Sequence, residues 1–178
     1  KNTKEISRSH KVITSDNGLV TITGGKWTSY RLMAEDTVDK AIEVCGLPKR
    51  KCVTKKFRIH GYRKNPDLTD HMYVYGSDEP KILRLIEQEP ALGEKLSQKF
   101  GYTLAEVVWA VREEMAITLE DVLARRVRML FVDAREAMAA APKAAAVMAR
   151  ELGRDQAWID EQVKSFTDLA KNYIFEQK

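Results

Sequence analysis

Two short runs near the start of the chain are rich in β-branched residues and bounded by turn residues, which is typical of strands. They cover residues 10–14 and 19–23, and the turn-rich tetrad Ser15-Asp16-Asn17-Gly18 separates them. Apolar residues then recur at helical spacing from Tyr30 to Ile42, and Gly46 followed by Leu47-Pro48 would end that helix. The pattern predicts a hairpin, or two strands of an incomplete sheet, followed by one helix.

The second part of the chain reads as almost wholly helical. Apolar stripes at helical spacing occupy residues 68–75, 82–86, 104–115, 119–130 and 159–173. Thr103 with Glu106 forms a capping box, Thr118 caps the following helix, and Asp133 with Glu136 repeats the pattern. We expect Pro142 to break the alanine-rich stretch into two helices, the second of which ends at Gly153.

Three arginines in four residues interrupt one of these stripes. Arg125, Arg126 and Arg128 cannot share one face of a helix, so at least one must lie near packed residues and needs a partner there. Glu113, Glu114 or Glu120 could supply a carboxylate and form a structural salt bridge. The alternative is that the arginines dock against another domain.

Composition excludes several classes of protein. The 178 residues are 44% hydrophobic and carry a formal net charge of +4, and no apolar run is long enough to cross a bilayer. Nucleic-acid binding normally brings aromatic stacking or a groove-fitting motif, and neither is evident.

The two cysteines, seven residues apart, fit free thiols better than a metal or redox motif. The three histidines have no paired ligand spacing, so we predict no metal site.

A basic run marks the change between the two parts of the chain, and we place the boundary between residues 47 and 60. Its six cations lie within ten residues: Lys49, Arg50, Lys51, Lys55, Lys56 and Arg58. One interpretation is a solvated connector between domains. The other is contact with anionic lipid headgroups.

The candidate functional motif lies between the second strand and the first helix. Gly24 and Gly25 allow close backbone approach, and the helix that follows would present its free N–H groups and positive dipole end outward. Lys26 adds a full positive charge. A tight connection with no ligand explains the same residues. The glycine spacing matches neither a Rossmann fingerprint nor a phosphate P-loop.

Two separated blocks carry a family resemblance. The first comprises residues 7–12 (SRSHKV) and 18–35 (GLVTITGGKWTSYRLMAE), and the second comprises residues 105–116 (AEVVWAVREEMA) and 118–128 (TLEDVLARRVR). The first resembles the end of the flavin domain of FAD-dependent glycerol-3-phosphate dehydrogenase, and the second resembles the helical C-terminal domain of the same family. The resemblance is weakest between about residues 49 and 100 and after Gly153.

The resemblance implies a mainly α fold with two parts. Residues 1–46 would be the C-terminal end of an α/β FAD-binding and substrate domain, present as a strand-turn-helix remnant, and residues 47–178 an all-helical C-terminal domain. The parent enzyme would oxidise sn-glycerol 3-phosphate to dihydroxyacetone phosphate by hydride transfer to flavin, with electrons passing to quinone. No G-x-G-x-x-G occurs in the chain, so we expect it to hold no FAD unaided and to be inactive alone.

Carried over residue by residue, the resemblance implies that Arg8 contacts the substrate phosphate, for which a guanidinium fork is suited. It implies that Gly24, Gly25, Lys26, Trp27 and Thr28 lie beside the isoalloxazine ring, where positive charge favours the reduced flavin. Lys26 is also the candidate catalytic residue, since it could polarise the substrate oxygen. The general base is expected outside this chain.

The sequence differs from the family pattern in two places. Ser29 stands where the family typically has threonine, which retains the hydroxyl. Mitochondrial relatives continue into EF-hands, and no such calcium loop occurs here, so we expect a bacterial type, cytoplasmic or peripheral on the inner face of the cell membrane. Two other functions stay open: an oxidase that passes electrons to oxygen, and a non-catalytic helical interaction module. The oligomeric state also stays open, a homo-oligomer included.

Overall fold

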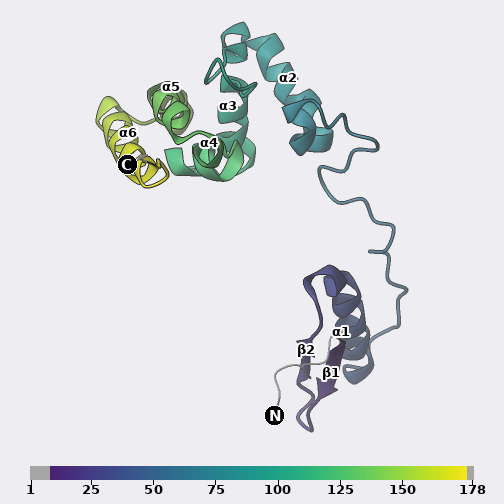
Figure 1. The fold of residues 1–178 in the computed structure, drawn as a ribbon. Helices are drawn as coiled ribbons and strands as arrows, with labels where there is room; N and C mark the ends of the chain where they lie inside the picture. The colour runs from purple at the N-terminus through teal and green to yellow at the C-terminus, as the bar shows by residue number, and fades with distance from the viewer. Residues whose placement is uncertain (1–8, 176–178) are drawn as a thin grey trace. The chain divides into compact units, whose positions relative to one another are not determined.

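The computed structural model describes residues 9–175, and these residues divide into two compact units, one ending at Ile59 and one beginning at His60. Helices dominate, and a single two-stranded antiparallel sheet is present among the described residues (Figure 1). The predicted mainly helical fold with a small strand-turn-helix segment before it is therefore confirmed.

The first unit is a β-hairpin packed against one helix (Figure 1). Strands β1 (His10–Thr14) and β2 (Val20–Gly24) pair with His10 opposite Gly24. A one-turn 3-10 helix, η2 (Trp27–Ser29), leads into α1 (Tyr30–Val44). The helix ends in a Schellman motif, because Gly46 has φ +63° and the Leu47 N–H donates to the Ile42 carbonyl at 2.9 Å. The predicted hairpin and helix are both confirmed.

The first unit has no closed hydrophobic core. None of its described residues is buried, and the inward positions of both strands reach only intermediate burial. Several large apolar side chains of the unit are more than half exposed: Ile13, Leu19, Trp27, Tyr30, Val38, Leu47, Val53, Phe57 and Ile59. A lone hairpin needs further strands or a packed helix layer to be stable in water, and here a single helix supplies only part of that cover.

The second unit is all-helical and holds the core. Its elements are η3 (His71–Asp78), α2 (Glu79–Gln88), η4 (Pro90–Gly93), α3 (Leu104–Glu113), the π-helix η5 (Asp121–Arg126), α4 (Met129–Val132), α5 (Ala134–Leu152) and α6 (Gln156–Lys171). Helix α5 packs against α3, α4 and α6 (Figure 1). Its buried face is mostly alanine, so neighbouring backbones can approach closely on either side.

Contacts near its N-terminal end fix the start of this second unit. The carbonyl of Gly61 accepts a hydrogen bond from the Ser77 N–H, the His60 ring pairs with Asp78, and Arg63 pairs with Glu79. Gly76 has φ +53°, and a Cβ there would collide with the Gly61 carbonyl. Only glycine fits where these two segments cross.

Two predicted helix boundaries are wrong. Pro142 does not break the alanine-rich stretch, because α5 continues through it and buried alanines pack on both sides of the proline. That packing outweighs the one hydrogen bond that proline removes. The helix expected over residues 119–130 is also interrupted. It is a π-helix as far as Arg126, and Arg128 then adopts φ +59° before α4 begins.

The predicted ion pairing of the clustered arginines is confirmed. Arg126, which is partly buried, lies 3.4 Å from the Glu114 carboxylate and also donates to the Glu114 carbonyl. Arg125 donates to Glu120 at 2.5 Å and to Asp121 at 2.9 Å. The arginines therefore hold the π-helix and the loop before it in place.

Glu106 is the principal buried charge of the helical unit. Its side chain is 0% exposed and accepts hydrogen bonds from the Thr103 N–H at 2.7 Å, the Tyr75 hydroxyl at 3.1 Å and the His71 ring at 3.2 Å. Burial raises the pKa of Tyr75 far above its usual value, so the hydroxyl remains a donor. Glu106 thus closes the capping box of α3 and anchors η3 to it.

The hydrogen bond that the His71 ring donates to Glu106 raises the pKa of His71 above 6.5, although burial opposes the shift. A raised folded-state pKa means that protonation of His71 stabilises the fold below about pH 6.5 and that this stability is lost as pH rises through the folded-state value. We therefore expect the free energy of unfolding to fall over that pH window and the His71→Gln variant to lose this part of the pH dependence. Denaturant titrations at a series of pH values measure it, and identical pH profiles for the two proteins would contradict the assignment.

Candidate functional site

The candidate site is the turn between β2 and η2, where two glycines bend the chain from strand to helix. Gly24 has φ +78° and Gly25 has φ +83°, a region that L side chains rarely adopt. A Cβ on Gly25 would lie 2.5 Å from the Met33 sulfur and 3.3 Å from the His10 Cβ. Glycine at position 25 therefore has a structural reason that is independent of any ligand: its positive φ, together with its close packing on Met33 and His10.

The residues after the glycines face outward. Lys26, Trp27 and Thr28 are all exposed, and the Trp27 ring, 87% exposed, stacks with Tyr30 at a centroid distance of 5.7 Å. The N–H groups of Trp27 and Thr28 precede the first helical hydrogen bond, which Ser29 donates to the Lys26 carbonyl. They therefore have no partner within the helix.

This arrangement can hold negative charge. The ammonium of Lys26 adds to the positive dipole end of the helix, and exposure leaves both open to a ligand. The structure brings the five residues of the predicted cofactor contact, Gly24, Gly25, Lys26, Trp27 and Thr28, into one continuous turn. Arg8, the predicted substrate residue, lies outside the described residues.

Ser29 has a role that the sequence analysis did not identify. Its hydroxyl donates to the Lys26 carbonyl at 2.9 Å and accepts from the Lys26 N–H at 3.2 Å. The spacing of Lys26 and Ser29 indicates this role, because the residue three positions after the one that begins a helix is the second member of a capping box. It was overlooked because lysine is an unusual first member of such a box.

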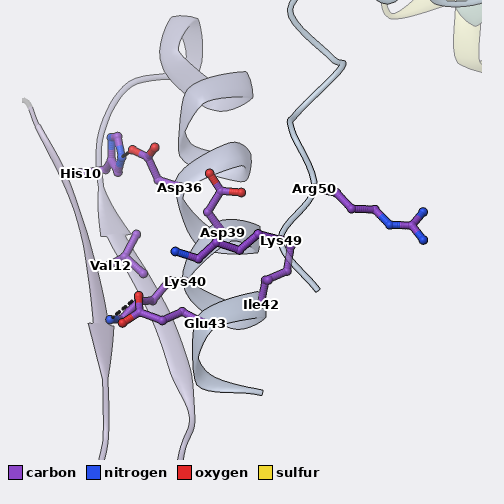
Figure 2. Close-up of a pocket in the computed structure, with 9 residues that line it drawn as sticks. All are labelled: His10, Val12, Asp36, Asp39, Lys40, Ile42, Glu43, Lys49 and Arg50. Carbon is purple, nitrogen blue, oxygen red and sulfur yellow. Dashed lines mark hydrogen bonds and ion pairs between the residues drawn. The ribbon is translucent and has the colours of Figure 1, made fainter. Parts of the chain in front are cut away.

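A hollow of about 570 Å³ lies between the hairpin and α1 and was not predicted (Figure 2). The His10 ring bonds Asp36 at 2.6 Å, and Lys40 bonds Glu43 at 3.0 Å. The charged residues that line the hollow are the carboxylates Asp36, Asp39 and Glu43 and the cations Lys40, Lys49 and Arg50. Charges of both signs line this hollow in equal number and are partly paired with each other, so its net charge does not indicate an ionic ligand of either sign.

An apolar groove of about 690 Å³ lies on another side of α1, where residues 50–59 run along the helix. Its apolar lining comes from Tyr30, Ala34, Val38, Val53, Phe57 and Ile59. Phe57 and Ile59 are about two-thirds or more exposed, at 67% and 72%. This groove shows where the first unit lacks covering protein.

Residues 9–175 contain neither a cluster of metal ligands nor a membrane-spanning helix. No three histidine, cysteine, aspartate or glutamate side chains in this range gather where they could hold a metal ion. No helix in the same range combines the length and apolar character needed to span a bilayer.

Comparison with known proteins identifies the relatives of this chain. Residues 21–159 match the family described as the C-terminal domain of alpha-glycerophosphate oxidase. The chain is 34% identical to a probable mitochondrial glycerol-3-phosphate dehydrogenase of Caenorhabditis elegans, over 98% of this chain and 26% of the relative. It is 32% identical to a probable mitochondrial glycerol-3-phosphate dehydrogenase of Dictyostelium discoideum, over 98% of this chain and 29% of the relative. It is 34% identical to the mitochondrial glycerol-3-phosphate dehydrogenase of Mesocricetus auratus, over 97% of this chain and 26% of the relative. The predicted family resemblance is confirmed.

The comparisons also correct the predicted location. The relatives are named as mitochondrial proteins, which overturns the expectation of a bacterial protein in the cytoplasm or on the inner face of a bacterial membrane. That expectation depended on the lack of an EF-hand loop. Because the chain spans only 26% to 29% of the length of these relatives, the lack of one motif in it does not distinguish the types.

Proposed function

We propose a function from one premise: the chain belongs to the family of the C-terminal domain of alpha-glycerophosphate oxidase. The parent protein, meaning the longer polypeptide of which this chain would be one part, is proposed to oxidise sn-glycerol 3-phosphate to dihydroxyacetone phosphate. The relatives named as glycerol-3-phosphate dehydrogenases support this reaction. The observation that carries the proposal is the exposed Gly-Gly-Lys turn within the family match.

The two units are proposed to have different roles. Residues 1–46 would complete an FAD-binding domain, and residues 47–178 would form the helical C-terminal domain. The absence of any buried residue among residues 9–59 supports an incomplete first part, because such a unit needs further protein to cover its apolar side chains, although the compact unit itself extends to Ile59. The helical unit, in contrast, buries a core of its own.

The residues of the turn suit a flavin. When bound, FAD would accept the electron pair that the substrate loses on oxidation. Lys26 and the N–H groups of Trp27 and Thr28 would stabilise the negative charge that the reduced ring carries. Arg8 would bind the substrate phosphate, and a base on the remaining polypeptide would take the hydroxyl proton. Lys26 would also polarise the substrate oxygen in this proposal.

The electron acceptor is proposed to be a membrane quinone, and the parent would meet the membrane as a peripheral protein. The alternative acceptor is molecular oxygen, as the name of the matching family suggests. The two acceptors leave different products, reduced quinone or hydrogen peroxide, so they can be assayed separately.

The test is to purify the full-length parent, measure its flavin content, and assay sn-glycerol 3-phosphate oxidation with a soluble quinone and with oxygen. We expect stoichiometric FAD and dihydroxyacetone phosphate formation supported by quinone. Peroxide formation at a comparable rate would favour the oxidase. A flavin-free, inactive parent would overturn the proposal and favour an interaction module.

A further inference from the structure

We propose that Ser29 is the positioning residue for Lys26, so that its hydroxyl fixes the backbone position from which the Lys26 side chain reaches the bound flavin or substrate. This inference rests on the proposed function of the turn. It starts from the backbone of Lys26, which is extended, with φ −134° and ψ 154°, while the next residues are already helical. A residue at such a junction has no regular hydrogen-bonding pattern on either side to hold it.

Ser29 supplies the missing constraint. Three bonds join the two residues: the Ser29 N–H and hydroxyl both donate to the Lys26 carbonyl at 2.9 Å, and the hydroxyl accepts from the Lys26 N–H at 3.2 Å. A hydroxyl can donate once and accept at the same time, so one side chain binds both polar groups of the Lys26 residue. The Cα of Lys26, from which its side chain departs, is thereby fixed relative to α1.

The same bonds decide which groups of the turn are free for a ligand. The Lys26 N–H points to Ser29, so the N–H groups of Trp27 and Thr28 and the ammonium remain as the outward-facing positive groups. Preorganised charge stabilises a developing negative charge because the protein need not reorganise during the reaction. A Lys26 that lost this constraint would keep its charge, but the backbone that carries the side chain would no longer be held in one position.

The experiment compares Ser29→Ala and Ser29→Thr in the flavin-loaded parent. We expect Ser29→Ala to lower kcat about 10-fold to 100-fold, since small misplacements of a positioned group have effects of this size. We also expect it to make the flavin reduction potential more negative and to change the KM for sn-glycerol 3-phosphate less than kcat. Ser29→Thr retains the hydroxyl and should restore both kcat and the potential.

Thr37→Ala is the matched control, because Thr37 donates its hydroxyl to the Met33 carbonyl at 2.7 Å further along the same helix. It should leave the potential and kcat unchanged. Equal effects of the two alanine variants, or a normal potential and kcat in Ser29→Ala, would overturn the positioning role. If Ser29→Ala fails to fold, Ser29→Cys, a weak hydrogen-bond donor, replaces it in the comparison with Ser29→Thr.

The outcomes separate this inference from the function on which it rests. A wild-type parent without flavin or dehydrogenase activity overturns both. An active wild-type parent whose Ser29→Ala variant is indistinguishable from it overturns the positioning role alone.

Discussion

Replacement of Glu106 by alanine is expected to lower the free energy of unfolding of the helical unit by about 3–5 kcal/mol, the usual cost of removing one partner from a buried charged network. The truncation leaves the Thr103 N–H, the Tyr75 hydroxyl and the His71 ring without the acceptor that they share, a side chain that is itself 0% exposed. Denaturant unfolding of the 178-residue chain, followed by circular dichroism, measures the loss.

Two variants on the same helix calibrate this effect. Glu106→Gln keeps one oxygen as an acceptor and can donate its amide to the Tyr75 oxygen, so it should cost less than Glu106→Ala while it removes the charge that raises the pKa of His71. Glu113→Gln changes an exposed carboxylate at the end of α3 and should leave stability nearly unchanged. A Glu106→Ala loss no larger than that of Glu113→Gln would show that the network contributes nothing to stability.

Local sequence signals predicted the elements whose ends are set by local chemistry. The Ser15-to-Gly18 turn, the glycine after α1, the capping box at Thr103 and the cap at Asp133 all lie where the sequence indicated. In each case the residues that define the boundary bond to backbone groups within a few positions. Such interactions need no knowledge of the rest of the fold.

The elements that the sequence did not predict depend on distant contacts. Pro142 remains inside α5 because buried alanines on both sides of it pack against other helices, α3 and α6 among them. The interruption at Arg128 follows a π-helix whose ion pairs reach back to Glu114. The proline predicted a break that packing prevents, and hydrophobic spacing predicted an unbroken helix over residues 119–130, since neither local signal includes packing or long-range pairing.

The sequence predicted only part of the candidate site, because part of it also depends on contacts between distant segments. The motif from Gly24 to Thr28 predicted a turn with its positive end outward, and the residues after the glycines are exposed. The requirement for Gly25, however, comes from Met33 and His10, which meet the turn only after the hairpin folds onto α1. A glycine that suggests a ligand site in the sequence thus also has a structural reason to be there.

Removal of the Lys26 ammonium separates these two explanations of the motif. In the flavin-loaded parent, Lys26→Ala is expected to lower kcat for sn-glycerol 3-phosphate by about 100-fold or more, the typical effect of deleting one preorganised stabilising group. The flavin reduction potential should become more negative as well, because a positive charge beside the reduced ring is lost. Since Lys26 is exposed and only its backbone is held by Ser29, the variant should fold normally.

The control for Lys26→Ala is Lys11→Ala, which removes an exposed lysine from β1, opposite Thr23 in the hairpin, and should change neither kcat nor potential. Lys26→Arg keeps the charge but replaces a compact ammonium with a planar guanidinium, so it should restore the potential more fully than the rate. If Lys26→Ala keeps wild-type potential and turnover, the turn is only a tight connection between strand and helix. The glycines would then be explained by the positive φ of both residues and by the packing of Gly25 on Met33.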